Sequence, residues 1–203
     1  MKIRDSGMPE ESYWESFFKP DSLLNNFIKD KINGDIVEFG CGYGTFTLAA
    51  ARKTYGKVFC LDIEKTMTER TENRCLSAKL SNIITINRDF ITNGTGLKDN
   101  SVQFVMLFNI LHLQKPHLLY KEAYRILCKG GRVGIIHWNH DSSTPRGPSL
   151  DIRPKPEQCK SWGEDAGFTF ENYIGLKSCP YHYGLSFIKE VYINKLNDFY
   201  NIS

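Results

Sequence analysis

The 203-residue sequence lacks several features that would point to particular classes of protein. Its six cysteines form no C-x-x-C pair and no spacing typical of zinc ligands, so we expect reduced thiols rather than a disulfide or metal framework. The longest apolar run, residues 104–113, has about half the length that a membrane span needs. No apolar segment follows the first residues, so we expect no secretory signal.

A strong charge of one sign is also missing. Lysine and arginine number 26 against 23 aspartate and glutamate, and the resulting net charge of +3 is spread along the chain. Such a chain has no strong field for nucleic acid or for an anionic membrane. With 41% hydrophobic residues it can form an ordinary globular core. We therefore predict a cytoplasmic protein, a monomer or homodimer, without a nucleic-acid or membrane partner.

What the sequence does contain is an alternation of strand-like and helix-like segments. Apolar runs predict strands at residues 35–39, 57–62, 82–87, 102–108 and 132–138. Helical spacing predicts helices near residues 9–18, at 22–30, 45–53 and 64–79, and from 116 to a stop at Gly130-Gly131. This alternation indicates an α/β fold with a parallel sheet covered on both faces. After a loop at 139–156 we expect a helix at 157–166 and strands at 169–174 and 184–193.

A glycine cluster, Glu38-Phe39-Gly40-Cys41-Gly42-Tyr43-Gly44, follows the first predicted strand. Glycines let the backbone approach a ligand without a Cβ in the way, so a nucleotide-type ligand can lie against this turn and the start of the next helix. A tight turn alone would use similar residues. Asp62 ends the second strand, where a carboxylate either accepts hydrogen bonds from ribose hydroxyls or caps the following helix.

Polar residues also follow the third and fourth predicted strands. Asp89 can accept a hydrogen bond from an exocyclic amine while Phe90 offers stacking contact, although a surface turn is an equal alternative. Asn109-Ile110-Leu111-His112-Leu113 places polar side chains at the tip of a buried strand, facing the ligand crevice. His112 can orient or deprotonate a substrate there, although a loop histidine bonded to backbone is more common.

Together these motifs resemble the class I S-adenosylmethionine-dependent methyltransferases over residues 34–138. The closest likeness is to the small-molecule branch that includes the ubiquinone- and menaquinone-biosynthesis type. A further matching string is Glu122-x-x-Arg125-x-Leu127-x-Lys129-Gly130-Gly131, although the proline usual before the two glycines is absent. The resemblance implies a Rossmann-like three-layer sandwich with a mostly parallel seven-stranded sheet and an antiparallel last strand. It divides the chain into a helical extension or lid (1–33) and a methyltransferase domain (34–203).

The resemblance also implies S-adenosylmethionine as cofactor and direct in-line transfer of its methyl group, which depends mainly on positioning. Glycines of the turn would approach the methionine moiety while Glu38 fixes its ammonium group. Asp62 would hold the ribose, Asp89 and Phe90 the adenine, and Asn109 the methionine side. The predicted cofactor set is Glu38, Gly40, Cys41, Gly42, Gly44, Asp62, Ile63, Asp89, Phe90 and Asn109.

In this family the acceptor, here expected to be a small molecule, is usually bound by the N-terminal extension and the loop after the fifth strand. The predicted acceptor residues are Tyr13, Trp14, His137, Trp138, Arg146 and Arg153, with His112 or His140 as the base. The extension forms a lid or a helix packed on the core, and both are open. The two arginines either clamp an anionic acceptor or pair with nearby acids. Residues 181–183 are expected to pack at a sheet edge.

Two other functions share these features. A nicotinamide-dependent oxidoreductase uses the same fold, but its Gly-x-Gly-x-x-Gly pattern would need glycine at position 45, which is Thr45. A non-catalytic S-adenosylmethionine-binding module would keep the pocket and methylate nothing. We expect no metal ion, because Asn109 and His137 stand at the strand tips where a metal-dependent enzyme of this fold would need acids.

Overall fold

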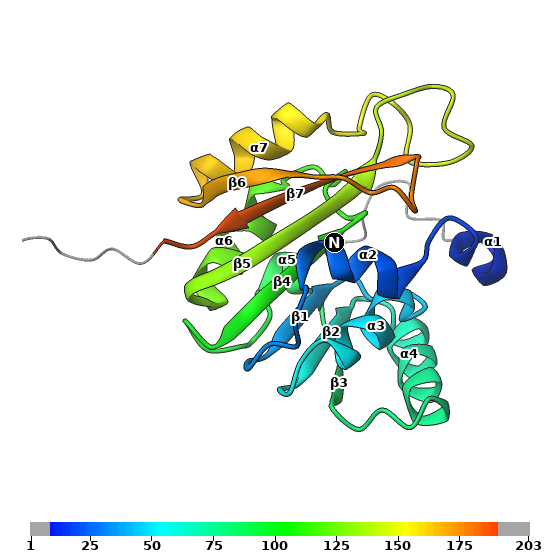
Figure 1. Ribbon diagram of the computed structural model, residues 1–203, viewed down its shortest axis with the longest axis vertical. Coiled ribbons are helices and arrows are strands. Elements are labelled where there is room, and N and C mark those ends of the chain that lie inside the picture. The colour runs from blue at the N-terminus through cyan, green and yellow to red at the C-terminus, as the bar shows by residue number, and fades with distance from the viewer. Residues whose placement is uncertain (1–8, 191–203) are drawn as a thin grey trace, which may run out of the picture.

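The computed structural model describes residues 9–190, which form a seven-stranded sheet in the order β3-β2-β1-β4-β5-β7-β6 (Figure 1). The strands are β1 (Ile36–Phe39), β2 (Val58–Asp62), β3 (Ile83–Asn87), β4 (Val102–Phe108), β5 (Leu127–Trp138), β6 (Thr169–Ile174) and β7 (His182–Ile188). Strands β1 to β5 are parallel, whereas β7 is antiparallel to both β5 and β6. The predicted sheet, mostly parallel with its last strand antiparallel, is confirmed.

Helices cover both faces of this sheet. They are α1 (Glu11–Glu15), α2 (Pro20–Phe27), α3 (Thr45–Arg52), α4 (Lys65–Ser77), α5 (Phe90–Asn93), α6 (His117–Ile126) and α7 (Pro156–Asp165). Along β4, Phe104 and Met106 pack into a core shared with α2 and α3, whereas Val105 and Leu107 pack into a core shared with α6. Alternate side chains of a strand point to opposite faces, so a strand covered on both sides is apolar throughout. This confirms the three-layer sandwich.

The N-terminal helices belong to the same body as the sheet (Figure 1). Leu23 and Leu24 of α2 are fully buried in the core that α3 shares with β1 and β4. In α1, Trp14 packs at the border of that core, with its ring 4.8 Å from the ring of Phe18. The division of the chain at residue 33 stays a prediction.

Gly130 and Gly131 do not stop the preceding helix as predicted. Helix α6 ends at Ile126, and both glycines lie inside β5, where the register with β4 shifts between Val102 and Phe104. Gly130 has a positive φ of 78°, and a Cβ on Gly131 would lie 2.9 Å from the carbonyl oxygen of Cys128. The glycines are therefore required by an irregularity in the strand. In the sequence, two glycines at such an irregularity look the same as two glycines that end a helix.

Two smaller differences concern the end of the third strand and the C-terminal half. The four-residue helix α5 after Arg88-Asp89 was not predicted. Residues 182 and 183 lie in β7, which is an inner strand, so they do not form a sheet edge. The predicted end of the last strand at residue 193 lies outside the described residues. Among residues 9–190, no helix is both long and apolar enough to span a bilayer.

Candidate active site

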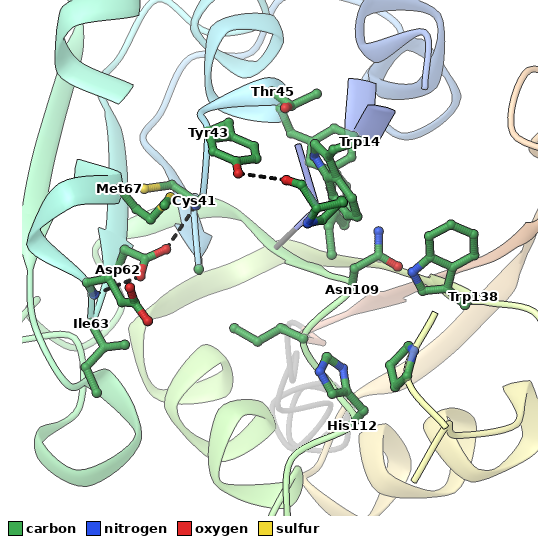
Figure 2. A pocket seen from close by; sticks show the side chains of 18 of the residues that line it. Trp14, Cys41, Tyr43, Thr45, Asp62, Ile63, Met67, Asn109, His112 and Trp138 are labelled. Atoms are coloured by element: carbon green, nitrogen blue, oxygen red, sulfur yellow. Dashed lines mark hydrogen bonds between the residues drawn. The ribbon is translucent and has the colours of Figure 1, made fainter. Parts of the chain in front are cut away.

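A cavity of about 460 Å³ opens at the carboxyl ends of the parallel strands (Figure 2). This is the edge at which open α/β sheets bind ligands, and the volume lies within the usual range for small-molecule sites. Its lining comes from the ends of β1, β2, β3, β4 and β5, from α1 and from the loop after β5. The lining residues are Pro9, Trp14, Gly40, Cys41, Gly42, Tyr43, Thr45, Phe46, Asp62, Ile63, Glu64, Met67, Asp89, Phe90, Ile91, Phe108, Asn109, Ile110, His112, Trp138, Arg146, Gly147 and Pro148.

Two walls of the cavity differ in how they are built. The turn side consists of residues that end or follow β1, β2 and β3: Gly40, Cys41, Gly42, Asp62, Ile63, Asp89 and Phe90. The loop side consists of Trp14, His112, Trp138 and Arg146, which come from α1, from the segment after β4 and from β5 and its loop. In Figure 2, Asp62 and Ile63 lie to the left and His112 and Trp138 to the right.

On the turn side, glycines expose the backbone to the cavity. Gly40, Gly42 and Gly44 have φ angles of 75°, 50° and 76°, which non-glycine residues rarely adopt. A Cβ on Gly40 would lie 2.8 Å from Cδ1 of Ile110. Gly44 begins α3 as its N-cap and lies outside the lining, although it was predicted to touch the ligand.

Asp62 ties the end of β2 to the glycine turn. Its carboxylate accepts the backbone N–H of Gly42 at 2.9 Å and that of Glu64 at 3.0 Å (Figure 2). Burial raises the pKa of this carboxyl, and the two backbone hydrogen bonds oppose that rise. Because the side chain also lines the cavity, Asp62 both shapes the turn and presents acceptor oxygens to a ligand.

Glu38 lies behind the turn rather than in the lining. Its side chain is buried, and the hydroxyl of Thr47 in α3 donates a hydrogen bond to it. Burial raises the pKa of Glu38 to about 8, with the hydrogen bond from Thr47 opposing the rise and the charge of Asp62 adding to it. Burial thus favours the protonated form of Glu38, and the side chain lies behind the turn, although it was predicted to contact the ligand directly.

Asp89 and Phe90 complete the turn side at the end of β3. Asp89 is the N-cap of α5, since its carboxylate accepts the backbone N–H groups of Ile91 at 3.2 Å and Thr92 at 3.0 Å. Phe90 packs edge-to-face on Phe39, with ring centroids 5.3 Å apart. Asp89 thus caps a short helix and also lines the cavity, and its hydrogen bond with an exocyclic amine stays a prediction.

At the tip of β4, Asn109 stands out in its backbone and in its side chain. Its φ of 54° is uncommon for a residue other than glycine. The amide nitrogen and oxygen are buried in the cavity wall and have no hydrogen-bond partner in the described part of the chain. Buried amides are normally paired, so these two atoms are where a bound ligand would find a donor and an acceptor.

On the loop side, His112 and Trp138 line the cavity but His137 does not. His137 is fully buried, and its Nε2 lies 3.3 Å from Nδ1 of His112. Burial first, and then the charge of His112, hold the pKa of His137 well below its usual value. The structure therefore places His137 behind His112, not against an acceptor as predicted.

Arg153 and His140 also lie outside the lining. The guanidinium of Arg153 donates to the carbonyl oxygens of Pro148, Asn139 and Asp141 and to the hydroxyl of Thr144. Its own carbonyl oxygen lies 2.7 Å from Nδ1 of the exposed His140. Arg153 thus stabilises the loop that carries Arg146. Arg153 and His140 were both predicted to reach the cavity, and neither does.

The start of the described chain lines part of the cavity. The carbonyl oxygen of Pro9 accepts a hydrogen bond from the hydroxyl of Tyr43 at 2.8 Å (Figure 2). Helix α1 is held on α4 by ion pairs that join Glu11 to Arg70 and Arg74, and Glu15 to Arg74 at 2.7 Å. Of the two predicted residues of α1, Trp14 lines the cavity, whereas Tyr13 is 45% exposed and lies outside the lining.

Sequence reasoning missed several lining residues. Apart from the acidic Glu64, they are apolar, aromatic or small side chains beside the motifs: Pro9, Tyr43, Thr45, Phe46, Glu64, Met67, Ile91, Phe108, Ile110, Gly147 and Pro148. Met67, in the first turn of α4 after Asp62, had a usable signal, because that turn must face the same strand edge as Asp62. The described residues contain no group of three His, Cys, Asp or Glu side chains that could hold a metal ion.

Comparisons with known proteins concern the fold and the family. Residues 36–131 match a family model described as a methyltransferase domain. No curated protein matches the chain. Among solved structures, a S-adenosylmethionine-dependent methyltransferase from Aquifex aeolicus has a TM-score of 0.78 and 20% sequence identity, with 89% of this chain and 94% of that chain covered.

Two further structures widen the comparison. A type 11 methyltransferase from Sulfolobus solfataricus is 28% identical with a TM-score of 0.66, and the match covers 85% of this chain and 93% of that chain. The phosphoethanolamine N-methyltransferase 2 of Haemonchus contortus, solved with S-adenosyl-L-methionine, is 15% identical with a TM-score of 0.68, and the match covers 84% of this chain and 52% of that chain.

Proposed function

We propose that the chain is a class I S-adenosylmethionine-dependent methyltransferase, as the family model and the similar folds support, and that its acceptor is a small molecule. The observation that carries this proposal is the closure of the cavity from two directions. Pro9 and Trp14 line one end, and Arg146, Gly147 and Pro148 of the loop after β5 line another. A cavity of about 460 Å³ walled in this way suits a compact acceptor beside the cofactor.

The charge on the loop side narrows the acceptor further. Arg146 is the only lysine or arginine among the cavity-lining residues of the described chain. A guanidinium binds carboxylate and phosphate groups in a fixed, two-pronged geometry, so an acceptor with an anionic group suits this wall. The acceptor named for the Haemonchus contortus enzyme, phosphoethanolamine, carries such a group. The scattered charge of the chain argues against a nucleic acid as acceptor.

The turn side suits S-adenosylmethionine residue by residue. The exposed backbone at Gly40 and Gly42, beside Cys41, would lie against the methionine portion, and the unpaired amide of Asn109 would bind its polar atoms. Asp62 would accept from the ribose hydroxyls, with Ile63 next to it. Asp89 and Phe90 would contact the adenine. Glu38 and Gly44 support the turn from behind and are positioning residues.

His112 is the base in this proposal. When bound, S-adenosylmethionine would supply a methyl group on a sulfonium. The acceptor's lone pair would bond to the methyl carbon while the electron pair of the S–CH₃ bond stays on sulfur. Nε2 of His112, on the far side of the ring from His137, takes the proton that the acceptor loses. Trp14 and Trp138 would exclude water from this side of the cavity.

The test is the fate of a labelled methyl group. Purified protein is incubated with a cell extract and S-adenosylmethionine that is tritiated on the methyl group, and the products are separated into small molecules, nucleic acid and protein. We expect the label in the small-molecule fraction, bound by an anion-exchange resin. Label in nucleic acid or protein would contradict the proposal, and tight cofactor binding without any labelled product would indicate a non-catalytic binding module.

Location and assembly remain predictions of the same proposal. We propose a cytoplasmic protein that is a monomer or homodimer. The six free cysteines support the location, because reduced thiols are typical of cytoplasmic proteins. Fractionation of cells would test the location, and gel filtration of the purified chain would test the oligomeric state.

A further inference from the structure

A pair of histidines stands behind the loop side of the cavity. Nδ1 of His112 lies 3.3 Å from Nε2 of His137, with the two rings nearly perpendicular at 71°. His112 lines the cavity and is 8% exposed, whereas His137, in β5, is fully buried. Only His112 can therefore contact a ligand, and His137 can act on the ligand only through His112.

The surroundings of His137 keep its ring neutral. Three titratable groups act on it: His112 from the segment after β4, His182 from the neighbouring β7, and Arg153 from the loop after β5. The ring of Tyr183 stacks on it at 6.2 Å. A fully buried imidazole beside a guanidinium has no gain from a proton, since burial and like charge both disfavour the cation.

If His137 is neutral, the direction of the hydrogen bond between the two rings is fixed whenever His112 is charged. An imidazolium donates from both nitrogens, so Nδ1–H of protonated His112 must donate to the lone pair on Nε2 of His137. The proton of His137 then resides on Nδ1, a buried nitrogen for which the described residues offer no hydrogen-bond partner. In the neutral pair the same arrangement leaves the lone pair of His112 on Nε2, which is the form that can accept a proton.

We propose that His137 is a positioning residue that holds His112 as the Nδ1–H tautomer and stabilises its protonated form through the Nδ1–H···Nε2 hydrogen bond. The proposal deepens the proposed function, because it rests on His112 being the base. It gives a buried neutral histidine the part that a carboxylate plays in many histidine-containing sites. The proton balance is complete, since the proton accepted by His112 remains on Nε2 and His137 only accepts a hydrogen bond.

The test is the titration of the histidine rings by two-bond ¹H–¹⁵N NMR on the full chain, without cofactor or acceptor. We expect His112 as the Nδ1–H tautomer when neutral, and His137 as the Nδ1–H tautomer with no titration between about pH 5 and pH 8. His137→Phe should lower the pH at which His112 titrates by about one unit, because a hydrogen bond to a charged donor is lost.

Two further variants separate positioning from packing. His137→Gln places an amide oxygen where Nε2 lies, so it should restore most of the His112 titration. His182→Phe changes a buried histidine whose ring packs 4.1 Å from Trp138, and it should leave the His112 titration unchanged. If His137→Phe does not fold, the wild-type spectrum alone decides between the tautomers.

A wild-type His137 protonated on Nε2, or a His112 titration indifferent to His137→Phe, would overturn the proposal. An equal shift in His182→Phe would do the same, since it would show a general effect of packing. Because these spectra need neither methyl donor nor acceptor, their outcome is independent of the labelling experiment. A failure of the small-molecule proposal is therefore distinguishable from a failure of the histidine pair.

Discussion

The turn side and the loop side of the cavity are built by different means. On the turn side, the ligand-facing groups follow directly from three parallel strands, and backbone N–H groups hold them in place, as Gly42 and Glu64 do for Asp62. On the loop side, Trp14, Trp138 and Arg146 come from segments separated by more than half of the chain. The proposed cofactor wall is thus encoded locally, whereas the proposed acceptor wall depends on tertiary packing.

The strongest way to separate the two sides is His112→Ala. Loss of a positioned base lowers turnover by about 10²- to 10⁴-fold, while the turn side keeps its contacts and the dissociation constant for S-adenosylmethionine stays within about twofold. The measurement is single-turnover methyl transfer with calorimetry of cofactor binding. His117→Ala, at an exposed histidine at the start of α6, is the matched control and should change neither quantity. A large loss of cofactor affinity in His112→Ala would contradict the division.

Asp62→Ala is the opposite test, because it should weaken cofactor binding on the turn side. It removes a carboxylate that lines the cavity and accepts two backbone hydrogen bonds, so the dissociation constant for S-adenosylmethionine should rise by about 10- to 100-fold. Calorimetry measures this, and thermal unfolding of the variant shows whether the fold is kept. Asp62→Asn, which keeps one acceptor oxygen, should lose less affinity than Asp62→Ala. Equal affinity in all three proteins would remove Asp62 from the site.

Gly40→Ala tests the exposed backbone of the turn side. A residue with a Cβ is strained at a φ of 75°, and this Cβ would approach Cδ1 of Ile110 to 2.8 Å. The strain of about 1–2 kcal/mol corresponds to roughly a tenfold weaker cofactor binding if the turn shifts to relieve it. Gly175→Ala is the control, because a Cβ there meets no atom within 4 Å. Unchanged affinity in Gly40→Ala would show that the turn is not in contact with the ligand.

Glu38→Gln has the smallest expected effect on ligand binding and shows instead in stability. The folded pKa of Glu38, about 8, lies above the ordinary glutamate pKa of 4.5. Between these values the unfolded chain loses the proton that the folded chain keeps, so the contribution of Glu38 to stability is full at low pH and is lost as the pH rises. Denaturant unfolding should show wild type losing about 1.4 kcal/mol per pH unit relative to Glu38→Gln from about pH 5 to pH 8. A constant difference would mean that Glu38 is ionised in the folded protein.

The turn side could be predicted from the sequence more fully than the loop side. Strand ends of a parallel sheet meet at one edge, so Gly40, Asp62, Asp89 and Asn109 could be brought together from their positions after apolar runs. Of the pairs His112 and His137, and Arg146 and Arg153, only the first member lines the cavity. This depends on side-chain directions in a loop and on an inner strand. Neither direction has a local signal, and the carbonyl oxygens that bind Arg153 exist only once the loop has folded.

The central claim is that this cavity binds S-adenosylmethionine, and calorimetric titration of the full chain tests it most directly. S-adenosylmethionine, S-adenosylhomocysteine and NADH are titrated in parallel into wild type and Asp62→Ala. The account predicts micromolar binding of the first two, no binding of NADH, and a clear loss of affinity in the variant. Binding of NADH alone, or of none of the three, would contradict it.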